Sequence, residues 1–426
     1  MKKTVNVAIM GIGTVGGGTY EILTSNHDFL LRTQGVDYRV TKVLDKNTDR
    51  LKMFGIPESC AAANVDDIAN DDEISIVVET MGGVEPAKTF IEKMLLAGKS
   101  VVTANKELVS KHWSSLEAAA RKGGAGLYFE ASCVGGVPII RALQESLQAN
   151  HINSIVGIIN GTTNYILTKM TEDGMSYADA LKEAQQLGYA EFNPTADVEG
   201  FDAAYKLSIL ASLAFHTCVP YTEIYREGIT KVTKADIKTG LELGYRIKLL
   251  AIGKRKGNVI EARVHPTFVP ADHPLAGVSG SFNAVYVNGD FVDDLMFYGR
   301  GAGARPTGSA IVSDVVYASK RTEPLYSDFD NNGKVAEGIE VSKDFRSKYY
   351  IAVSVKDAPG VLAAVTGVFA DHNVSIESVS QRAGGTGAVI CFLTHTANES
   401  DVNKAVSDIE SLDDTNKVVS LIRVLG

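Results

Sequence analysis

The chain has 426 residues, 45% hydrophobic and 22% charged, and a formal net charge of -9. This composition predicts a globular protein of two or three domains, and the acidic balance disfavours nucleic acid or an anionic membrane as the main partner. No signal peptide or membrane span is predicted, and we expect a cytoplasmic protein. Zinc and disulfide frameworks are not expected, because no CxxC pair occurs among Cys60, Cys133, Cys218 and Cys391.

Strands and helices alternate along the first 134 residues. Apolar runs predict strands at 5–10, 38–44, 74–80, 100–103 and 127–130. Helical periodicity predicts helices at 19–31, 86–97 and 116–122. The alternation predicts an α/β fold, a Rossmann-type doubly wound parallel sheet that forms a dinucleotide-binding domain over residues 1–134. An amphipathic helix at 305–320 is expected to return to this domain.

A glycine-rich turn, residues 11–16, joins the first strand to the first helix. Glycines permit a tight turn and a close approach of the backbone to a pyrophosphate at the helix N-terminus. The residues expected to bind a dinucleotide are Gly11, Gly13, Thr14, Val15 and Gly16; the alternative is a plain strand-to-helix turn. After the second strand, Asp45 favours NAD, whereas Lys46, with Arg50 nearby, favours NADP. The expected cofactor is therefore NADP or NAD.

A lysine follows the fourth strand in the segment Thr103-Ala104-Asn105-Lys106. Ligands of such sheets bind at the carboxyl ends of the strands. Lys106 is therefore expected to contact a phosphate or to pass a proton to a reacting oxygen, and the alternative is an ordinary surface lysine.

The rest of the chain divides into two further domains and a linker. Residues 135–304 mix strands, at 152–159 and 282–287, with helices, at 178–187 and 203–215, which predicts an α+β domain on a mixed sheet. Residues 321–348 are polar and predict a linker. Residues 349–426 follow the order strand, helix, strand, strand, helix, strand, which is typical of a ferredoxin-like unit.

The densest group of charged residues lies between Ala184 and Lys206. Asp202 and Lys206 are four residues apart on a predicted helix, so the carboxylate can position the ammonium. Glu191 and Asp197 come from the preceding loop and suit a substrate ammonium. An amino-acid substrate fits this pattern, and the alternative is a surface loop with a helical salt bridge.

This segment resembles the signature of homoserine dehydrogenases, with the spacing intact from Ala184 through Gly188, Pro194, Asp197, Gly200 and Asp202 to Lys206. Other blocks agree with the same family: the glycine turn, Glu79 to Gly83, Thr103 to Lys106, Glu130 to Pro138, Asn160 to Leu167 and Tyr298 to Gly303. The resemblance covers about residues 5 to 320. Related bacterial enzymes often carry an arginine after the second strand, which suits NADP. This chain has Leu44-Asp45-Lys46-Asn47 there, so the resemblance does not choose between NADP and NAD.

The resemblance implies a reversible, NAD(P)-dependent interconversion of L-homoserine and L-aspartate 4-semialdehyde in threonine, methionine and isoleucine biosynthesis. It gives the acid/base role to Lys206, with Lys106 acting at the reacting oxygen and Asp202 supporting Lys206. The implied substrate-binding residues are Glu191, Asp197, Gly161, Thr162 and Tyr189. Further residues implied at the cofactor are Thr80, Thr103, Lys106, Gly188 and Gly303.

The resemblance also implies a monovalent cation, Na+ or K+, held by Glu130 and by backbone carbonyls of Cys133, Gly135 and Val137. Oxygen ligands suit a hard cation. The alternative is a tight glycine turn between domains.

The C-terminal residues, with Asp357-Ala358-Pro359-Gly360-Val361-Leu362 and then Asn373-Val374-Ser375-Ile376, resemble an ACT domain over 349–426. The implied effector is L-threonine, and the alternative is a module that serves only dimerisation. The family implies a homodimer through the domain 135–304, or a homotetramer through ACT pairing. Two rival functions are another Rossmann-type amino-acid dehydrogenase and a catalytically inactive amino-acid sensor.

Overall fold

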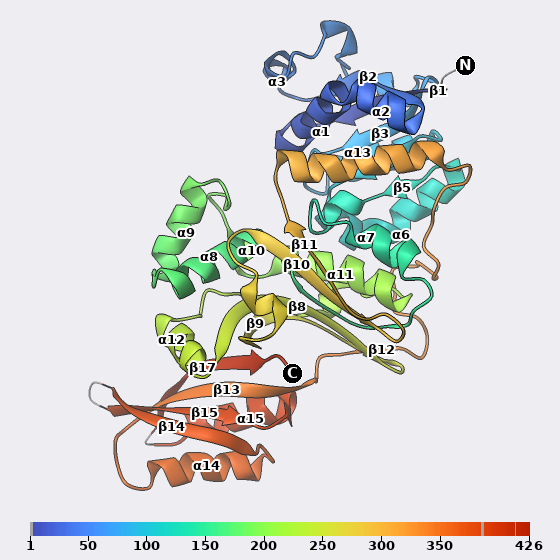
Figure 1. Ribbon diagram of the computed structural model, residues 1–426. Coiled ribbons are helices and arrows are strands. Elements are labelled where there is room, and N and C mark those ends of the chain that lie inside the picture. Colours follow the sequence, from blue (N-terminus) through green and yellow to red (C-terminus); the bar gives the residue numbers. More distant parts are fainter. Residues whose placement is uncertain (1–2, 385–386, 414) are drawn as a thin grey trace.

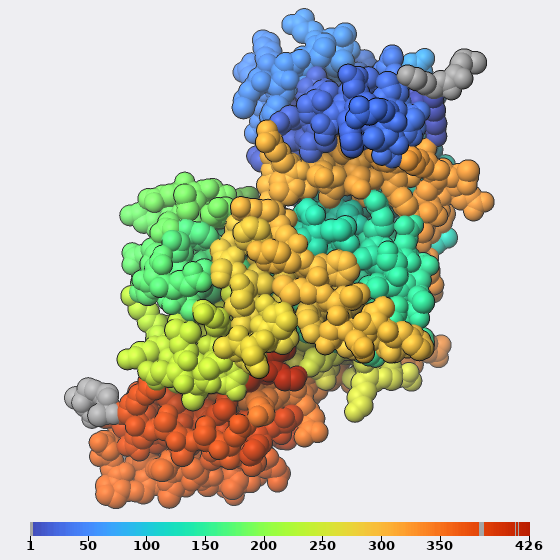
Figure 2. Space-filling view, in the orientation of Figure 1, coloured from blue at the N-terminus to red at the C-terminus, as the bar shows by residue number. Residues whose placement is uncertain are grey.

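The computed structural model describes residues 3–384, 387–413 and 415–426. Its three parts follow one another from the top of Figure 1 to the bottom, in the order of the sequence. The N-terminal part and the middle part face each other across a notch, bordered below by the lobe of α8 (Gly161–Glu172) and α9 (Tyr177–Gln186) (Figure 2).

The N-terminal part is built on a five-stranded sheet with the order β2-β1-β3-β4-β5, in which every pair is parallel. Its strands are β1 (Lys3–Met10), β2 (Val36–Leu44), β3 (Ile74–Glu79), β4 (Ser100–Thr103) and β5 (Leu127–Tyr128). Its helices are α1 (Thr14–Ser25), α2 (His27–Gln34), α3 (Thr48–Met53), α4 (Asp66–Ala69), α5 (Ala87–Leu96) and α6 (Lys106–Gly123). The predicted Rossmann-type sheet is confirmed, and its apolar strands are buried because helices cover both faces.

The helices differ from the prediction in three places. The predicted helix 19–31 is two helices, α1 and α2, which are separated at Asn26. Helix α1 begins at Thr14 rather than at residue 19, because the second half of the glycine turn is itself helical. Helix α6 begins at Lys106 rather than at 116, because the Asn105 side chain caps it by accepting the N–H of Leu108.

Helix α13 (Ala304–Lys320) packs against α1 of the N-terminal part, although it follows the middle part in sequence (Figure 1). A Cβ on Gly18 would lie 2.3 Å from the carbonyl oxygen of Ala304, and one on Gly308 would meet the Gly18 backbone at 2.9 Å. Glycine at these positions therefore lets the two helix backbones approach each other closely.

The middle part is a helix-covered mixed sheet. Its strands are β6 (Ile152–Ile158), β7 (Tyr225–Arg226), β8 (Tyr245–Lys256), β9 (Val259–Pro270), β10 (Phe282–Gly289) and β11 (Asp293–Arg300). Its remaining helices are α7 (Ile139–Arg141), α10 (Thr195–Val198), α11 (Phe201–Phe215) and α12 (Lys234–Glu242). The apolar helix α11 is buried almost throughout and packs on β6, β8 and β9. Strand β11 was not predicted.

The C-terminal part has the expected order of a ferredoxin-like unit. Its elements are β13 (Arg346–Val355), α14 (Val361–Asp371), β14 (Ile376–Gly384), β15 (Gly387–Thr394), β16 (Ala397–Asn398), α15 (Glu399–Glu410) and β17 (Thr415–Val424). The order β17-β13-β15-β14 is antiparallel throughout. Its strands continue the sheet of the middle part, because Arg423 and Val424 of β17 pair in parallel with Thr267 and Phe268 of β9.

Residues 321–345 run along the surface in contact with all three parts. Phe329 packs edge-on against Trp113 of α6, and Ser327 and Asn331 donate to the Glu117 carboxylate. Strand β12 (Glu340–Ser342) then pairs with β9. This polar segment is therefore tied to its neighbours along its course. Among the described residues, no helix has the length and hydrophobicity to cross a membrane.

Candidate functional site

A group of charged side chains meets where the N-terminal and middle parts face each other. Lys106 is the first residue of α6, directly after the turn that follows β4, and Asp202 and Lys206 come from successive turns of α11. Helix α11 begins after Gly200, whose φ of +78° is a conformation that favours glycine. Asp202, which is buried, therefore lies in the first turn of the helix.

Asp202 lies between two ammonium groups. Lys206 Nζ donates to Asp202 Oδ2 at 2.6 Å, and Lys106 Nζ lies 3.4 Å from Asp202 Oδ1. Lys206 also donates to the Ile159 carbonyl at 2.8 Å. The Lys206 side chain is 11% exposed, whereas that of Lys106 is 43% exposed. An ammonium has three N–H donors, so Lys206 keeps one beyond these two contacts.

The asparagine before α8 joins this group to a second carboxylate. Asn160 Nδ2 donates to Asp202 Oδ2 at 2.8 Å and to Asp197 Oδ1 at 2.7 Å, while its Oδ1 accepts the N–H of Thr163 as the helix cap. The sequence analysis named Asn160 only within the family block Asn160 to Leu167 and gave it no role, so this role of Asn160 was missed. A cap residue directly before Gly161 was the signal available.

The charges of the group shift the pKa values of its members. Burial disfavours ionisation of Asp202, but Lys206 and Lys106 outweigh burial and hold its pKa below the usual range. The pKa of Lys106 is raised, chiefly by the Asp202 carboxylate. The pKa of Asp197 is raised by burial and then by the nearby Asp202 charge. Asp202 is therefore an anion and Lys106 a cation at neutral pH.

The other predicted substrate residues line the same region. Thr162 Oγ1 donates to the Tyr189 carbonyl at 2.5 Å, and the Tyr189 ring packs on Tyr165. Glu191 lies in the exposed loop after α9, close enough to raise the pKa of Lys106. Among the hydrogen bonds of the described residues, the first two N–H groups of α8, from Gly161 and Thr162, have no acceptor. They suit a small anion.

The glycine turn has the close packing that a dinucleotide requires. Gly11 has a φ of +93°, and a Cβ on Gly16 would lie 2.0 Å from the Gly11 carbonyl oxygen. Helix α1 begins with Thr14 and Val15, so both of these predicted residues lie at its N-terminus. Thr80 Oγ1 donates to the Gly11 carbonyl at 2.6 Å, which ties the turn to the end of β3. These residues fit a dinucleotide.

The three charged residues that follow β2, Asp45, Lys46 and Arg50, differ in their contacts. The Asp45 carboxylate turns inward and accepts the N–H groups of Ile12, at 2.7 Å, and Asn47, at 2.8 Å. Arg50, with a half-exposed side chain, has its Nη1 3.9 Å from Asp45. Lys46 makes no hydrogen bond or ion pair among the described residues.

A buried carboxylate, Glu79, appeared in the sequence analysis only within the family block Glu79 to Gly83 and was given no role there. It ends β3, accepts the hydroxyl of Thr103 at 2.6 Å and the N–H of Met81 at 2.7 Å, and so links the ends of β3 and β4 beside the glycine turn. Burial raises the pKa of Glu79. Gly188 and Gly303 both have positive φ values, and Gly303 precedes α13.

The predicted cation loop lies next to α11. Both Glu130 oxygens accept backbone N–H groups, from Ile140 at 2.9 Å and Arg141 at 2.7 Å, and burial raises the Glu130 pKa. The thiol of Cys133 contacts the Lys206 carbonyl at 3.8 Å, and burial raises its pKa to about 12. Gly135 and Val137 follow in the same loop, where a Cβ on Gly135 would collide with the Gly301 carbonyl oxygen. Within the described parts of the chain, no group of three or more His, Cys, Asp or Glu side chains is placed to hold a metal ion.

Comparison with known proteins identifies the family. The family model described as "Homoserine dehydrogenase, NAD binding domain" matches residues 11–130, the one described as "Homoserine dehydrogenase" matches 138–316, and the ACT domain matches 349–414. A homoserine dehydrogenase of Neisseria gonorrhoeae is 40% identical over 430 residues, which is 99% of each chain.

Solved structures agree with this match. A homoserine dehydrogenase from Thiobacillus denitrificans has a TM-score of 0.92 at 41% identity, covering 99% of this chain and 98% of its own. A hyperthermophilic archaeal homoserine dehydrogenase in complex with NADPH has a TM-score of 0.64 at 29% identity, covering 75% of this chain and 99% of its own. Because the similarity extends over nearly the full length, the chain belongs to the homoserine dehydrogenase family of nicotinamide-dependent oxidoreductases and carries an ACT domain.

Proposed function

We propose that the chain interconverts L-homoserine and L-aspartate 4-semialdehyde at the group formed by Lys106, Asp202 and Lys206. The observation that carries this proposal is the buried carboxylate of Asp202 between two lysine ammonium groups, contributed by two different domains. When bound, the nicotinamide ring supplies the hydride donor or acceptor. In the reducing direction, Lys206 gives a proton to the developing alkoxide, and in the oxidising direction its neutral amine takes that proton from the hydroxyl.

Lys106 holds the reacting oxygen by its charge. Its side chain is more exposed than that of Lys206, and the Asp202 charge keeps it protonated. A fixed cation at this position stabilises negative charge as it develops on the oxygen. Asp202 keeps both ammonium groups in place but, with its oxygens engaged by lysines and Asn160, it is a positioning residue.

Both charged groups of the amino-acid substrate, its ammonium and its carboxylate, have partners in the site. Glu191 and Asp197 receive the ammonium, and the N–H groups of Gly161 and Thr162 at the start of α8 receive the carboxylate. The close contact between Thr162 and the Tyr189 carbonyl supports this arrangement, because it joins the helix start to the loop that carries Glu191.

We infer that NADP is the preferred cofactor and NAD the alternative. The residues that would hold it are Gly11, Gly13 and Gly16 with the start of α1, and Thr80, Thr103, Gly188 and Gly303 around them. Asp45 is engaged by backbone N–H groups, whereas Arg50 beside it has a half-exposed guanidinium suited to a 2′-phosphate. The NADPH complex of the archaeal relative supports the same preference.

Three further parts of the proposal concern the loop 130–137, the ACT domain and the assembly. Na+ or K+ binds Glu130 and the carbonyls of Cys133, Gly135 and Val137. L-Threonine binds the ACT domain and inhibits the enzyme, and the reaction belongs to threonine, methionine and isoleucine biosynthesis. The chain forms a homodimer through β10 and β11, where Tyr298, 54% exposed, stacks on Phe282, with a homotetramer through the ACT domain as the higher state.

The test is homoserine-dependent reduction of NADP and NAD, followed by absorbance, with and without Na+ or K+. The wild-type chain is expected to be active, and Lys206→Met to lose most of its kcat. Lys182→Met, which changes an exposed lysine of α9, is the matched control and should behave as wild type. Absence of homoserine oxidation by the wild-type chain with either cofactor would overturn the proposal.

A further inference from the structure

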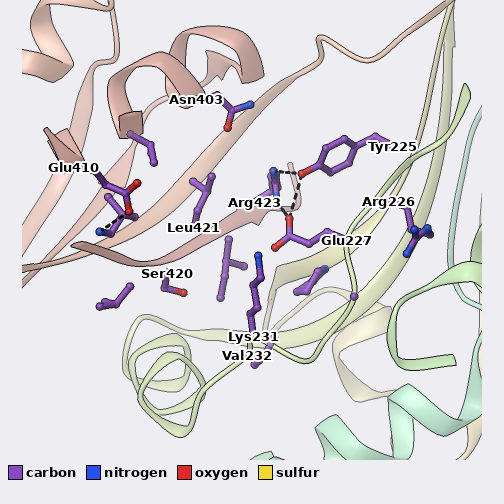
Figure 3. Close-up of a pocket in the computed structure, with 16 residues that line it drawn as sticks. Tyr225, Arg226, Glu227, Lys231, Val232, Asn403, Glu410, Ser420, Leu421 and Arg423 are labelled. Atoms are coloured by element: carbon purple, nitrogen blue, oxygen red, sulfur yellow. Dashed lines mark hydrogen bonds and ion pairs between the residues drawn. The ribbon is translucent and has the colours of Figure 1, made fainter. Parts of the chain in front are cut away.

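A cavity of about 440 Å³ lies between the ACT domain and the middle domain. Its upper wall is formed by α15 and β17, and its lower wall by β7 and the loop that follows it, residues 225–232 (Figure 3). It is separate from the group around Asp202 and from the turn at residues 357–360, neither of which lines it.

The cavity is lined by an ammonium, a carboxylate and a hydroxyl, each with a donor or acceptor that has no partner among the described residues. Lys231 extends into it with its ammonium directed toward the Glu227 carboxylate (Figure 3), and Lys231 makes no hydrogen bond or ion pair among the described residues. Glu227 uses only Oε2, which accepts from Arg423 and from the Tyr225 hydroxyl. The hydroxyl of Ser420 faces the same space and has no described partner.

The remaining wall is aliphatic, and its residues include Val232, Val406 and Leu421. A cation, a carboxylate oxygen and a hydroxyl beside an aliphatic wall are the complement of a small zwitterion with a short side chain. Nucleotides and other polyanions are disfavoured, because the carboxylates of Glu227 and Glu410 also line the cavity.

One side of the cavity is fixed by a buried ion network. Arg423 of β17, with a side chain only 2% exposed, pairs with Glu399 of α15 at 2.5 Å, with Glu227 across the domain boundary, and with the Tyr225 hydroxyl at 2.7 Å. The ACT domain therefore holds the segment 225–227 directly through a desolvated guanidinium.

The other side of the same segment supports the start of α11. The N–H of Ile229 donates to the Val198 carbonyl at 2.8 Å, and the Arg226 guanidinium lies 3.4 Å from the centre of the Phe201 ring and donates to the Glu199 carbonyl. A Cβ on Gly228 would lie 2.2 Å from the Val198 carbonyl oxygen. Residues 198–201 stand between the two carboxylates Asp197 and Asp202, so the segment is packed against the backbone that positions them.

We propose that this cavity is a binding site for a small aliphatic or hydroxylated α-amino acid, and that its occupant alters the substrate site by moving residues 225–230. The ligand carboxylate contacts Lys231, and the ligand ammonium contacts Glu227. A ligand that binds one position of this segment better than another shifts the placement of Asp197 and Asp202, which is a coupling free energy between two sites. This inference deepens the regulatory part of the proposed function and rests on it.

The experiment uses the full chain and four probes: L-threonine, L-valine, L-isoleucine and L-methionine. Binding is measured by titration calorimetry, and the ratio of homoserine oxidation with and without each probe is measured at several homoserine concentrations. The variants are Lys231→Met, which removes the cation from an exposed position, and Ser420→Trp, which fills the cavity. Lys234→Met is the control, because Lys234 starts α12 and does not line the cavity.

For the probe that binds wild type, both cavity variants are expected to raise the half-saturating concentration about tenfold or more, the loss of about 1.4 kcal/mol of binding, while the control does not. If L-threonine inhibits all variants equally, the cavity is not the site, although threonine regulation stands. If another probe binds in a Lys231-dependent way and L-threonine does not, the cavity stands and the threonine proposal fails. If no probe binds wild type, both fail.

Discussion

Replacing Lys206 by methionine separates the catalytic role of the lysine from its structural role. The side chain keeps a similar length, but the Asp202 carboxylate loses its partner at 2.6 Å and the Ile159 carbonyl loses a donor. Removing one member of a buried pair costs about 3–5 kcal/mol of stability. We expect about 3 kcal/mol, the lower end, because Lys106 remains 3.4 Å from Asp202.

Removing the proton-transfer group is expected to lower kcat by a factor of about 10² to 10⁴. The double variant Asp202→Asn/Lys206→Met removes both charges of the pair, so part of the lost stability is expected to return, with a coupling energy of about 1–3 kcal/mol. Its kcat is expected to stay low. In the double variant, stability therefore partly recovers whereas kcat does not.

The assay combines urea unfolding with kcat per folded enzyme for the wild type, both single variants and the double variant. Lys182→Met controls for the loss of a lysine from the surface. A kcat of Lys206→Met within about fivefold of wild type, well short of a catalytic contribution, would refute proton transfer by this lysine. A double variant no more stable than Lys206→Met would refute the energetic pairing.

Three further predictions follow from other parts of the structure. Lys248 is buried and desolvation lowers its pKa to about 8 from 10.5; the folded state therefore releases this proton first, and the unfolding free energy should rise between about pH 8 and 10.5, by up to about 3 kcal/mol. Lys248→Met should remove this rise, and equal slopes for the two proteins in urea titrations across that range would contradict it. Arg50→Ala should raise the KM for NADP about tenfold or more while leaving that for NAD within about twofold, and an equal change for both cofactors in steady-state kinetics would exclude contact with the 2′-phosphate. Glu130→Gln should abolish stimulation by Na+ or K+, measured as the ratio of rates with and without the salt at constant ionic strength; an unchanged ratio would remove Glu130 from the cation proposal.

Much of the fold could be predicted from local sequence patterns. The apolar strands of the N-terminal sheet and the order of elements at 349–426 were predictable, because strand and helix periodicities are encoded in neighbouring residues. The start of α6 was missed although two local signals were present: Asn105 is a capping residue type, and Leu108, Val109 and Trp113 continue the helical spacing of the predicted segment. Strand β11 was missed because its residues alternate between half-buried and exposed positions at the edge of the sheet.

The sequence by itself determined the chemistry that is local: the glycine turn at 11–16 and the spacing of four residues that puts Lys206 beside Asp202. Only the tertiary structure brought Lys106 and Asn160 to the Asp202 carboxylate. It also joined Glu79 to Thr103 at the ends of β3 and β4, and paired β17 with β9 beside Arg423. These contacts link segments far apart in the chain, and they form because burying charges requires partners that no local pattern specifies.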